Sequence, residues 1–228
     1  MSKTISIEQK LRNIGFRIAV NDKIEGLTNK QLLSDFDIER TLIEVAYVIK
    51  NEADYRLLSI LLTWVKVFGE YVIVEKFKKL SKQIVKERGQ NSILNGIAVW
   101  GFINKQTKWK TLIENSELNS YLVDVALTKS SEKFHGFKKD WLKFGVKVPE
   151  NMLRERATDV FSLEELAAKN LQFRNRLLFG ACWRSDIIMA LELGISKPSE
   201  IEKILECSHE PAIRISKEYR IAKIGNAA

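Results

Sequence analysis

The stretch that most clearly predicts the fold is SKPSEIEKILECSHEPAIRISKEYR, residues 196–220. It divides into two short helices at Cys207 and Ser208. Ser196 is suited to cap the first helix, with Pro198 in the first turn, where the missing amide costs no hydrogen bond. Ser208 is in turn suited to cap the second helix, whose first turn holds a further proline. The sequence therefore predicts a helix, a tight turn and a second helix.

A third short helix precedes these two. The segment RSDIIMALEL, residues 184–193, is apolar at helical spacing and is followed by Gly194, which stops it. The apolar positions of the three helices are spaced so that they can close one small core. They are Ile187, Ile188, Leu191, Ile201, Ile204, Leu205, Ala212, Ile215, Tyr219 and Ala222.

The second helix and the turn carry a motif, which consists of Pro198, Ser199, Glu200, Ile201, Ile204, Leu205 and Ser208. With it, residues 184–224 resemble the trihelical helix-turn-helix domains of bacterial transcription regulators, in which the third helix enters the major groove. The resemblance implies that Ser208, His209, Glu210, Arg214, Lys217 and Arg220 face DNA. By the same resemblance, Ser208 and Arg220 contact phosphates.

The segment also departs from that family's pattern. Glu202 replaces the small residue often found in the second helix, and Glu206 stands where the turn commonly has glycine. The third helix carries Ile213, Ile221 and Ile224, which is more apolar than a freely solvated recognition helix. These isoleucines leave open that the helix packs against the N-terminal part or a second copy of the chain.

Helical spacing extends through the rest of the 228 residues, which include only three prolines and eleven glycines. Within 38–49, Ile38, Leu42, Val45 and Ile49 fall on one face. Residues 54–68 are apolar nearly all round, which is typical of a helix at the centre of a bundle. We therefore predict an all-α, multi-helix bundle with a C-terminal trihelical helix-turn-helix unit.

Residues 71–88 read as an amphipathic surface helix that ends at Gly89. Its apolar side is formed by Ile73, Phe77, Leu80 and Ile84. A basic stripe of Lys78, Lys79, Lys82 and Lys86 lies roughly opposite and is the second candidate surface for a polyanion. A solvated helix face explains such lysines equally.

Residues 61–80 match residues 93–112 at an offset of 32, pairing Gly69 with Gly101 and Phe77 with Trp109. Each copy would form a helix, a glycine turn and a second helix, as in solenoid-like repeats. Two copies do not make an array of repeats. The alternative, that the two stretches share the spacing of their core residues by coincidence, therefore stays open.

The predicted organisation has three parts: a helical body over 1–128, a basic connector over 129–160 and a C-terminal helical unit over 161–228. The connector interleaves lysines with Phe134, Phe137, Trp141 and Phe144. These rings either anchor a loop to the core or stack on single-stranded nucleic acid. The last part opens with a capping box, Ser162 to Glu165, and its helix is expected to run to Gly180.

Composition excludes several classes of function. The charge of +8 is compatible with polyanion binding. The sequence has two histidines, two cysteines and none of the common catalytic motifs, so we expect no enzyme activity, no catalytic residues, no cofactor and no metal. Cys182 and Cys207 are expected to be buried thiols. No apolar run reaches the length of a membrane span, so no membrane partner is expected and the cytoplasm is the default location.

The leading hypothesis is a helical protein that binds double-stranded DNA, of the transcriptional regulator type. It rests on residues 184–224 and on the positive charge. The alternative is a non-catalytic helical module that binds a protein partner or a second copy of itself.

Overall fold

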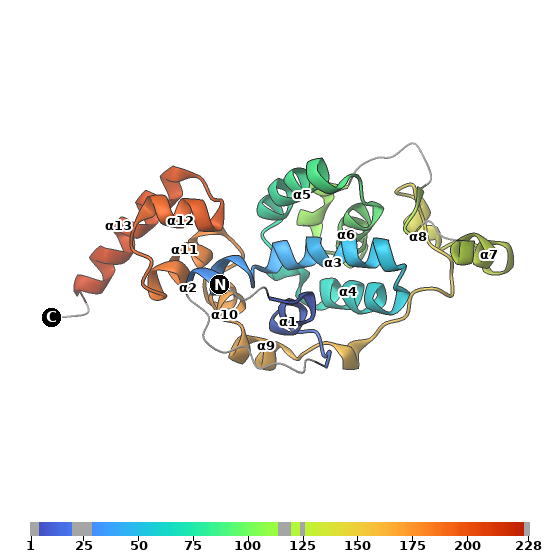
Figure 1. Ribbon diagram of the computed structural model, residues 1–228, viewed down its shortest axis with the longest axis horizontal. Helices are drawn as coiled ribbons and strands as arrows, with labels where there is room; N and C mark the ends of the chain where they lie inside the picture. Colours follow the sequence, from blue (N-terminus) through green and yellow to red (C-terminus); the bar gives the residue numbers. More distant parts are fainter. Residues whose placement is uncertain (1–4, 20–28, 114–119, 124–125, 226–228) are drawn as a thin grey trace. The chain divides into compact units, whose positions relative to one another are not determined.

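The structure, a computed structural model, describes residues 5–19, 29–113, 120–123 and 126–225. These residues are predominantly helical, which confirms the predicted all-α class (Figure 1). The chain forms two compact units. Unit 1 combines residues 1–41 with 161–228, and unit 2 consists of residues 42–160. The first 41 residues thus belong with the C-terminal segment, and the basic stretch 129–160 belongs with the helices that precede it.

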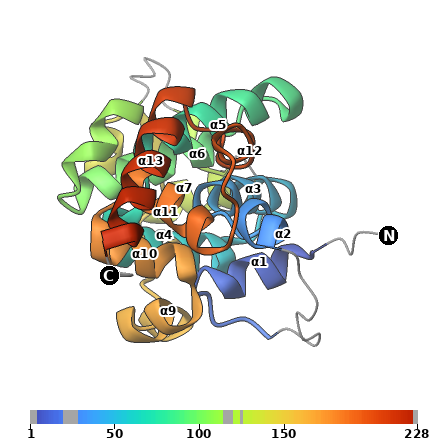
Figure 2. The same ribbon diagram turned by 90° about the vertical axis from the view of Figure 1, so that its left-hand side faces the viewer.

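Unit 1 contains two N-terminal helices, the first turn of α3 and five C-terminal helices. Their bounds are α1 (Ile7–Asn13), α2 (Asn29–Ser34), α9 (Leu163–Lys169), α10 (Leu171–Phe179), α11 (Trp183–Glu192), α12 (Pro198–Leu205) and α13 (His209–Gly225). Contacts join α13 to both α11 and α12, and α12 to α2. The last three helices lie together in both ribbon views (Figures 1 and 2).

Unit 2 contains most of α3 (Ile38–Glu52) and the elements up to Val160. They are α4 (Tyr55–Phe68), α5 (Val74–Arg88), α6 (Ser92–Ile103), α7 (Ala126–His135) and α8 (Lys139–Leu142), the 3-10 helices η1 (Gly69–Tyr71), η2 (Thr107–Leu112) and η3 (Ala157–Asp159), and the strands β1 (Ser120–Tyr121) and β2 (Val146–Lys147). The two strands pair in parallel, with Ser120 opposite Val146.

The apolar patterns of α3 and α4 place them in the core as predicted. Ile38, Leu42, Val45 and Ile49 are all buried along one side of α3. In α4, an unbroken run from Leu58 to Val65 is buried, so this helix is covered nearly all round. Asp54 begins α4 by accepting the amide of Leu57 at 2.8 Å.

Helix α5 is amphipathic, as its sequence predicts. Phe77, Leu80 and Ile84 are buried, and the chain leaves the helix at Gly89, which has a φ of 81°. The helix begins at Val74, later than expected, because residues 69–71 form the 3-10 turn η1.

The two sequence copies at offset 32 differ in their second halves. Gly69 caps α4 and is followed by η1 and α5, whereas Gly101 lies inside α6 and is followed by the six-residue η2. Both glycines allow close approach: a Cβ at Gly69 would lie 2.1 Å from Gln106 Oε1, and one at Gly101 would lie 2.6 Å from the Trp109 indole. The shared glycines therefore serve packing within one bundle.

The aromatic residues of 129–147 mostly anchor this stretch to unit 2. Trp141 is buried and stacks on Trp100 at 5.5 Å between ring centroids. Phe144 meets Phe102 edge-on, and Phe137 lies against Tyr121. Phe134 is the exception, because it is 79% exposed. Three of the four rings are thus engaged in packing rather than free to stack on bases.

The predicted continuous helix from Ser162 to Gly180 is wrong, because the chain breaks at Asn170. The capping box at Ser162 and Glu165 is present and starts α9. Asn170 then adopts an extended conformation and caps α10, with its Oδ1 accepting the amide of Phe173 at 2.7 Å. Its Nδ2 donates to Asn13, a partner 157 residues away that local pattern does not reveal.

Candidate nucleic-acid interface

The core of the C-terminal three-helix unit comes from α11, α12, α13 and one residue of α2. Its buried members include Leu33, Ile187, Ala190, Ile201, Leu205, Ala212 and Ile215. Ile188, Leu191 and Ile204 are partly buried against it. Tyr219 is half-buried and Ala222 is exposed, so the core covers α13 less far toward its C-terminus than predicted.

The turn between α12 and α13 consists of Glu206, Cys207 and Ser208. Glu206 adopts the left-handed conformation, with φ 55° and ψ 30°, at the position where helix-turn-helix families commonly have glycine. A side chain there costs roughly 1 kcal/mol. The carboxylate of Glu206 pairs with Arg40, which supports the turn in this conformation. Cys207 is buried in the core below.

The start of α12 differs from the prediction in its cap. Lys197 occupies the N-cap position without a side-chain cap hydrogen bond, and Pro198 is the first helical residue. Ser196 lies one residue earlier and accepts a hydrogen bond from Arg220 Nη2 through its carbonyl, at 2.9 Å. Arg220 therefore links α13 to the loop before α12.

All six predicted DNA-contacting residues are exposed. They are Ser208, His209, Glu210, Arg214, Lys217 and Arg220. The helical period places His209, Ile213, Lys217 and Ile221 in one row, with Lys217 at the middle of the exposed face. Ile213 and Ile221 are 45% and 61% exposed, so in this structure they are not covered by the rest of unit 1.

Several charges on this face are paired with one another. Arg214 contacts Glu210 at 3.0 Å and Glu218 at 3.5 Å, and Glu218 also pairs with Arg184. His209 lies 2.7 Å from Glu202. Arg214 and Glu210 are 54% and 74% exposed, and such pairs are worth about 0–1 kcal/mol. Phosphates can replace carboxylates in contacts this weak.

Lys217 stands apart from these pairs. Within the part of the chain that the structure describes, no hydrogen bond or ion pair engages its ammonium group. It is therefore the cation of α13 that is most available to an incoming anion.

The positive charge of the chain is concentrated away from α13. Residues 183–225 contain seven Lys and Arg and seven Asp and Glu, so the three-helix unit is neutral. Unit 2 holds 20 of the 37 basic residues and 14 of the 29 acidic ones, a net charge of +6. Long-range attraction to a polyanion would therefore come mainly from unit 2, whereas α13 would rely on the local placement of its own cations.

The lysines of α5 form the second predicted basic patch. Lys78, Lys79, Lys82 and Lys86 are all exposed. Lys78 Nζ reaches the carbonyl of Thr111 at 3.4 Å. The patch lies wholly within unit 2, on a helix whose other side is buried.

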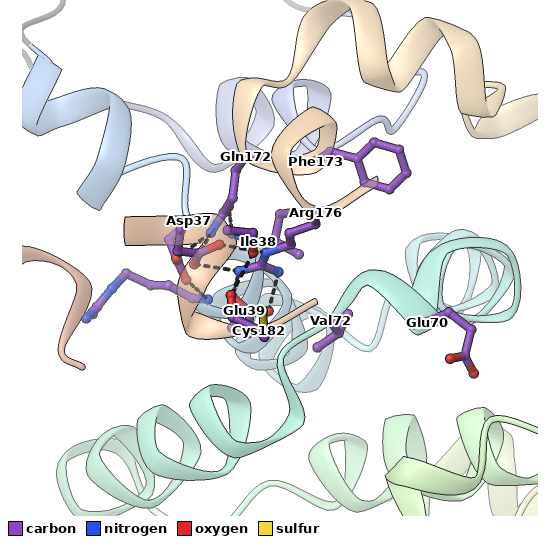
Figure 3. A network of polar contacts seen from close by, with 12 residues as sticks. Asp37, Ile38, Glu39, Glu70, Val72, Gln172, Phe173, Arg176 and Cys182 are labelled. Carbon is purple, nitrogen blue, oxygen red and sulfur yellow. Dashed lines mark hydrogen bonds and ion pairs between the residues drawn. The ribbon is translucent and has the colours of Figure 1, made fainter. Parts of the chain in front are cut away.

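A buried ionic cluster joins α3, α10 and α11 in unit 1 (Figure 3). The Arg176 side chain is fully buried and donates to both oxygens of Glu39, at 2.6 and 2.9 Å, and to both oxygens of Asp186, each at 2.8 Å. Gln172 bridges Asp186 and Asp37 through its Nε2. Sequence analysis did not predict this cluster, and Glu39 lies 137 residues from Arg176.

The electrostatics of this cluster favour a structural role. Burial lowers the pKa of the Arg176 guanidinium, but Asp186 and Glu39 more than offset this and hold the pKa well above its ordinary value. Asp37, Glu39 and Asp186 bring their oxygens close enough to hold a metal ion, yet the guanidinium already contacts two of the three. Because every one of these carboxylates is buried, a substrate in solvent does not reach them.

The two cysteines have different environments. Cys207 is buried as predicted, but Cys182 is exposed, so the expectation that both are buried thiols is wrong for Cys182. Cys182 occupies the N-cap position of α11, where the extended chain enters the first helix of the three-helix unit.

The comparisons with protein families, curated proteins and solved structures gave no match. Among the residues that the structure describes, no helix combines the length and the apolar character needed to cross a bilayer.

Proposed function

We propose that this chain is a helical DNA-binding protein of the regulator type, which contacts the major groove of duplex DNA with the outward face of α13. The observation that carries the proposal is the turn at Glu206–Ser208. Its left-handed first residue joins α12 to α13 while both keep their apolar sides in one core. The opposite side of α13 is left open, with Lys217 at its middle and Arg214 and Arg220 beside it.

The charge distribution supports a division of roles. The net charge of unit 2 would attract DNA without regard to sequence, whereas the neutral three-helix unit would contribute specific contacts. A cytoplasmic location and a regulatory role belong to the same proposal.

Fluorescence anisotropy with a labelled DNA duplex at low salt tests the proposal. The variant Arg214→Gln with Lys217→Gln and Arg220→Gln should bind more weakly than the wild type, by a factor that falls as salt is raised. The matched control is Lys133→Gln with Lys139→Gln and Lys143→Gln, which removes three exposed lysines elsewhere in the chain. Equal affinity of the α13 variant and the control would refute the role of α13.

A second set of variants separates α13 from α5. Replacing Lys78, Lys79, Lys82 and Lys86 by glutamine should reduce the affinity for every duplex to a similar extent, because these residues would act only through charge. If instead this variant alone abolishes binding, the polyanion site is on α5 and the proposal for α13 is wrong.

The alternative function, a protein-binding module, is favoured by one observation. The end of α10 exposes three consecutive apolar residues: Leu177 at 38%, Leu178 at 70% and Phe179 at 46%. Exposed apolar side chains of this size mark many protein interfaces. Light scattering across a concentration series would support self-association if Leu178→Ser with Phe179→Ser lowered the measured mass, and would exclude it if the wild type stayed monomeric.

A further inference from the structure

A pocket in unit 2 lies between α5, the start of α6 and the end of η2, with a volume of about 870 Å³. Its apolar lining comes from Phe77, Val85, Leu94, Leu112 and Ile113. This volume is within the range of sites that bind small molecules, roughly 300–1,000 Å³. A ligand with an apolar body of moderate size therefore fits the pocket.

The charged lining residues that the structure describes have a single sign. Lys78, Lys82 and Lys86 follow one another at every fourth residue of α5, and all three line the pocket while remaining exposed. Among the described residues, no aspartate or glutamate lines it. The N-terminus of α6 adds the positive end of a 12-residue helix through Ser92 and Asn95. The pocket therefore favours an anion.

Two polar groups in the lining residues are unpaired. Asn91 is 5% exposed, and its Oδ1 caps α6 by accepting the amide of Ile93. Its Nδ2 and the Oγ of Ser81 have no hydrogen-bond partner within the described part of the chain. Burying a donor without a partner is unfavourable, so an acceptor supplied by a ligand would be stabilising here.

We propose that this pocket binds a small amphiphilic anion with an apolar body and one carboxylate or phosphate head group. The apolar lining takes the body, and the lysine row with the α6 N-terminus takes the head group. A neutral apolar ligand would leave the three lysines unused, and a compact, highly charged anion would leave the apolar lining unfilled. The inference does not depend on DNA binding, because every residue that carries it lies in unit 2.

The test measures binding of 11-(dansylamino)undecanoate, a fluorescent fatty acid, to the full chain. Saturable binding is expected at one probe per chain. Decanoate and decyl phosphate should displace the probe, and 1-decanol should displace it far less. Whichever anion competes better identifies the head group. Displacement by 1-decanol as effective as by the anions would overturn the proposal.

Three variants place the binding in this pocket. Lys78→Gln with Lys82→Gln and Lys86→Gln should weaken probe binding about tenfold, since three exposed charge contacts are worth roughly 0.5 kcal/mol each. The control triple at Lys133, Lys139 and Lys143 should bind as the wild type does. Asn91→Asp keeps a good helix cap but adds a negative charge beside the head group, and should also weaken binding.

Circular dichroism serves as the control that each variant keeps its helices. If a folded Lys78, Lys82 and Lys86 triple variant and a folded Asn91→Asp variant both bind the probe with unchanged affinity, the proposal is wrong. The two proposals can fail separately. The α13 variant should lose DNA binding but bind the probe with unchanged affinity.

Discussion

Replacement of Arg176 by methionine should be among the most damaging single changes to this protein. The side chain makes four hydrogen bonds to Glu39 and Asp186 without exposure to solvent. Removing it takes the guanidinium away from two carboxylates that are fully buried. Breaking a buried ion pair in this way costs about 3–5 kcal/mol, out of a total stability of roughly 5–15 kcal/mol.

Urea unfolding followed by circular dichroism measures this loss. With an m-value of about 2 kcal/mol/M, a loss of 4 kcal/mol lowers the unfolding midpoint by roughly 2 M. The matched control is Arg184→Met, which removes an exposed arginine whose partner Glu218 is also exposed. It should change the stability by no more than about 1 kcal/mol. Equal midpoints for the two variants would refute the reasoning.

The pH dependence gives a second signature. The pKa of Arg176 is raised in the folded protein. The contribution of Arg176 to the folding stability is therefore complete below its pKa in the unfolded chain, and is lost only as pH rises through its pKa in the folded protein. The wild-type contribution is therefore constant from about pH 5 to 9. Adding Glu39→Gln and Asp186→Asn to Arg176→Met should recover part of the stability at neutral pH.

Four further predictions concern local structure. Ser162→Ala should cost about 1 kcal/mol in urea unfolding by removing the α9 cap. The backbone amide of Ser162 lowers the pKa of Glu165. The stabilisation from this carboxylate is therefore present above its unfolded pKa and is lost as pH falls through its folded pKa. Glu165→Gln should abolish this acid-dependent loss without changing the helix content at neutral pH. Gly101→Ala should destabilise by about 1–3 kcal/mol, because the new methyl group meets the buried Trp109, and a thermal melt no lower than that of the wild type would contradict this. Glu206→Gly should change the stability by less than about 1 kcal/mol because glycine adopts the same turn freely, whereas Glu206→Val should cost more than Glu206→Gly in the same assay.

The features that sequence predicted well are those set by neighbouring residues. The capping box at Ser162, the buried face of α3 and the stop at Gly194 each depend on spacing within a few residues. The trihelical core was predictable for the same reason, because each of its three helices carries its own apolar row.

The features that sequence missed depend on partners far along the chain. Asn170 breaks a strong helical pattern because its side chain caps α10 and binds Asn13. The sequence contains no local sign that Glu39 meets Arg176, since the two lie 137 residues apart. The α5 pocket was also missed, because its lysines read as a solvated helix face until α6 and η2 supply the apolar side.

The salt dependence of duplex DNA binding tests the central proposal most directly. If Arg214, Lys217 and Arg220 each neutralise a phosphate, they account for about 2.7 units of the slope of log K against log salt, or roughly 40-fold in affinity over a fourfold rise in salt. The α13 variant should have a slope smaller by that amount, and the control triple at Lys133, Lys139 and Lys143 should lose less of the wild-type slope than the α13 variant does. An α13 variant with the full wild-type slope would contradict the account.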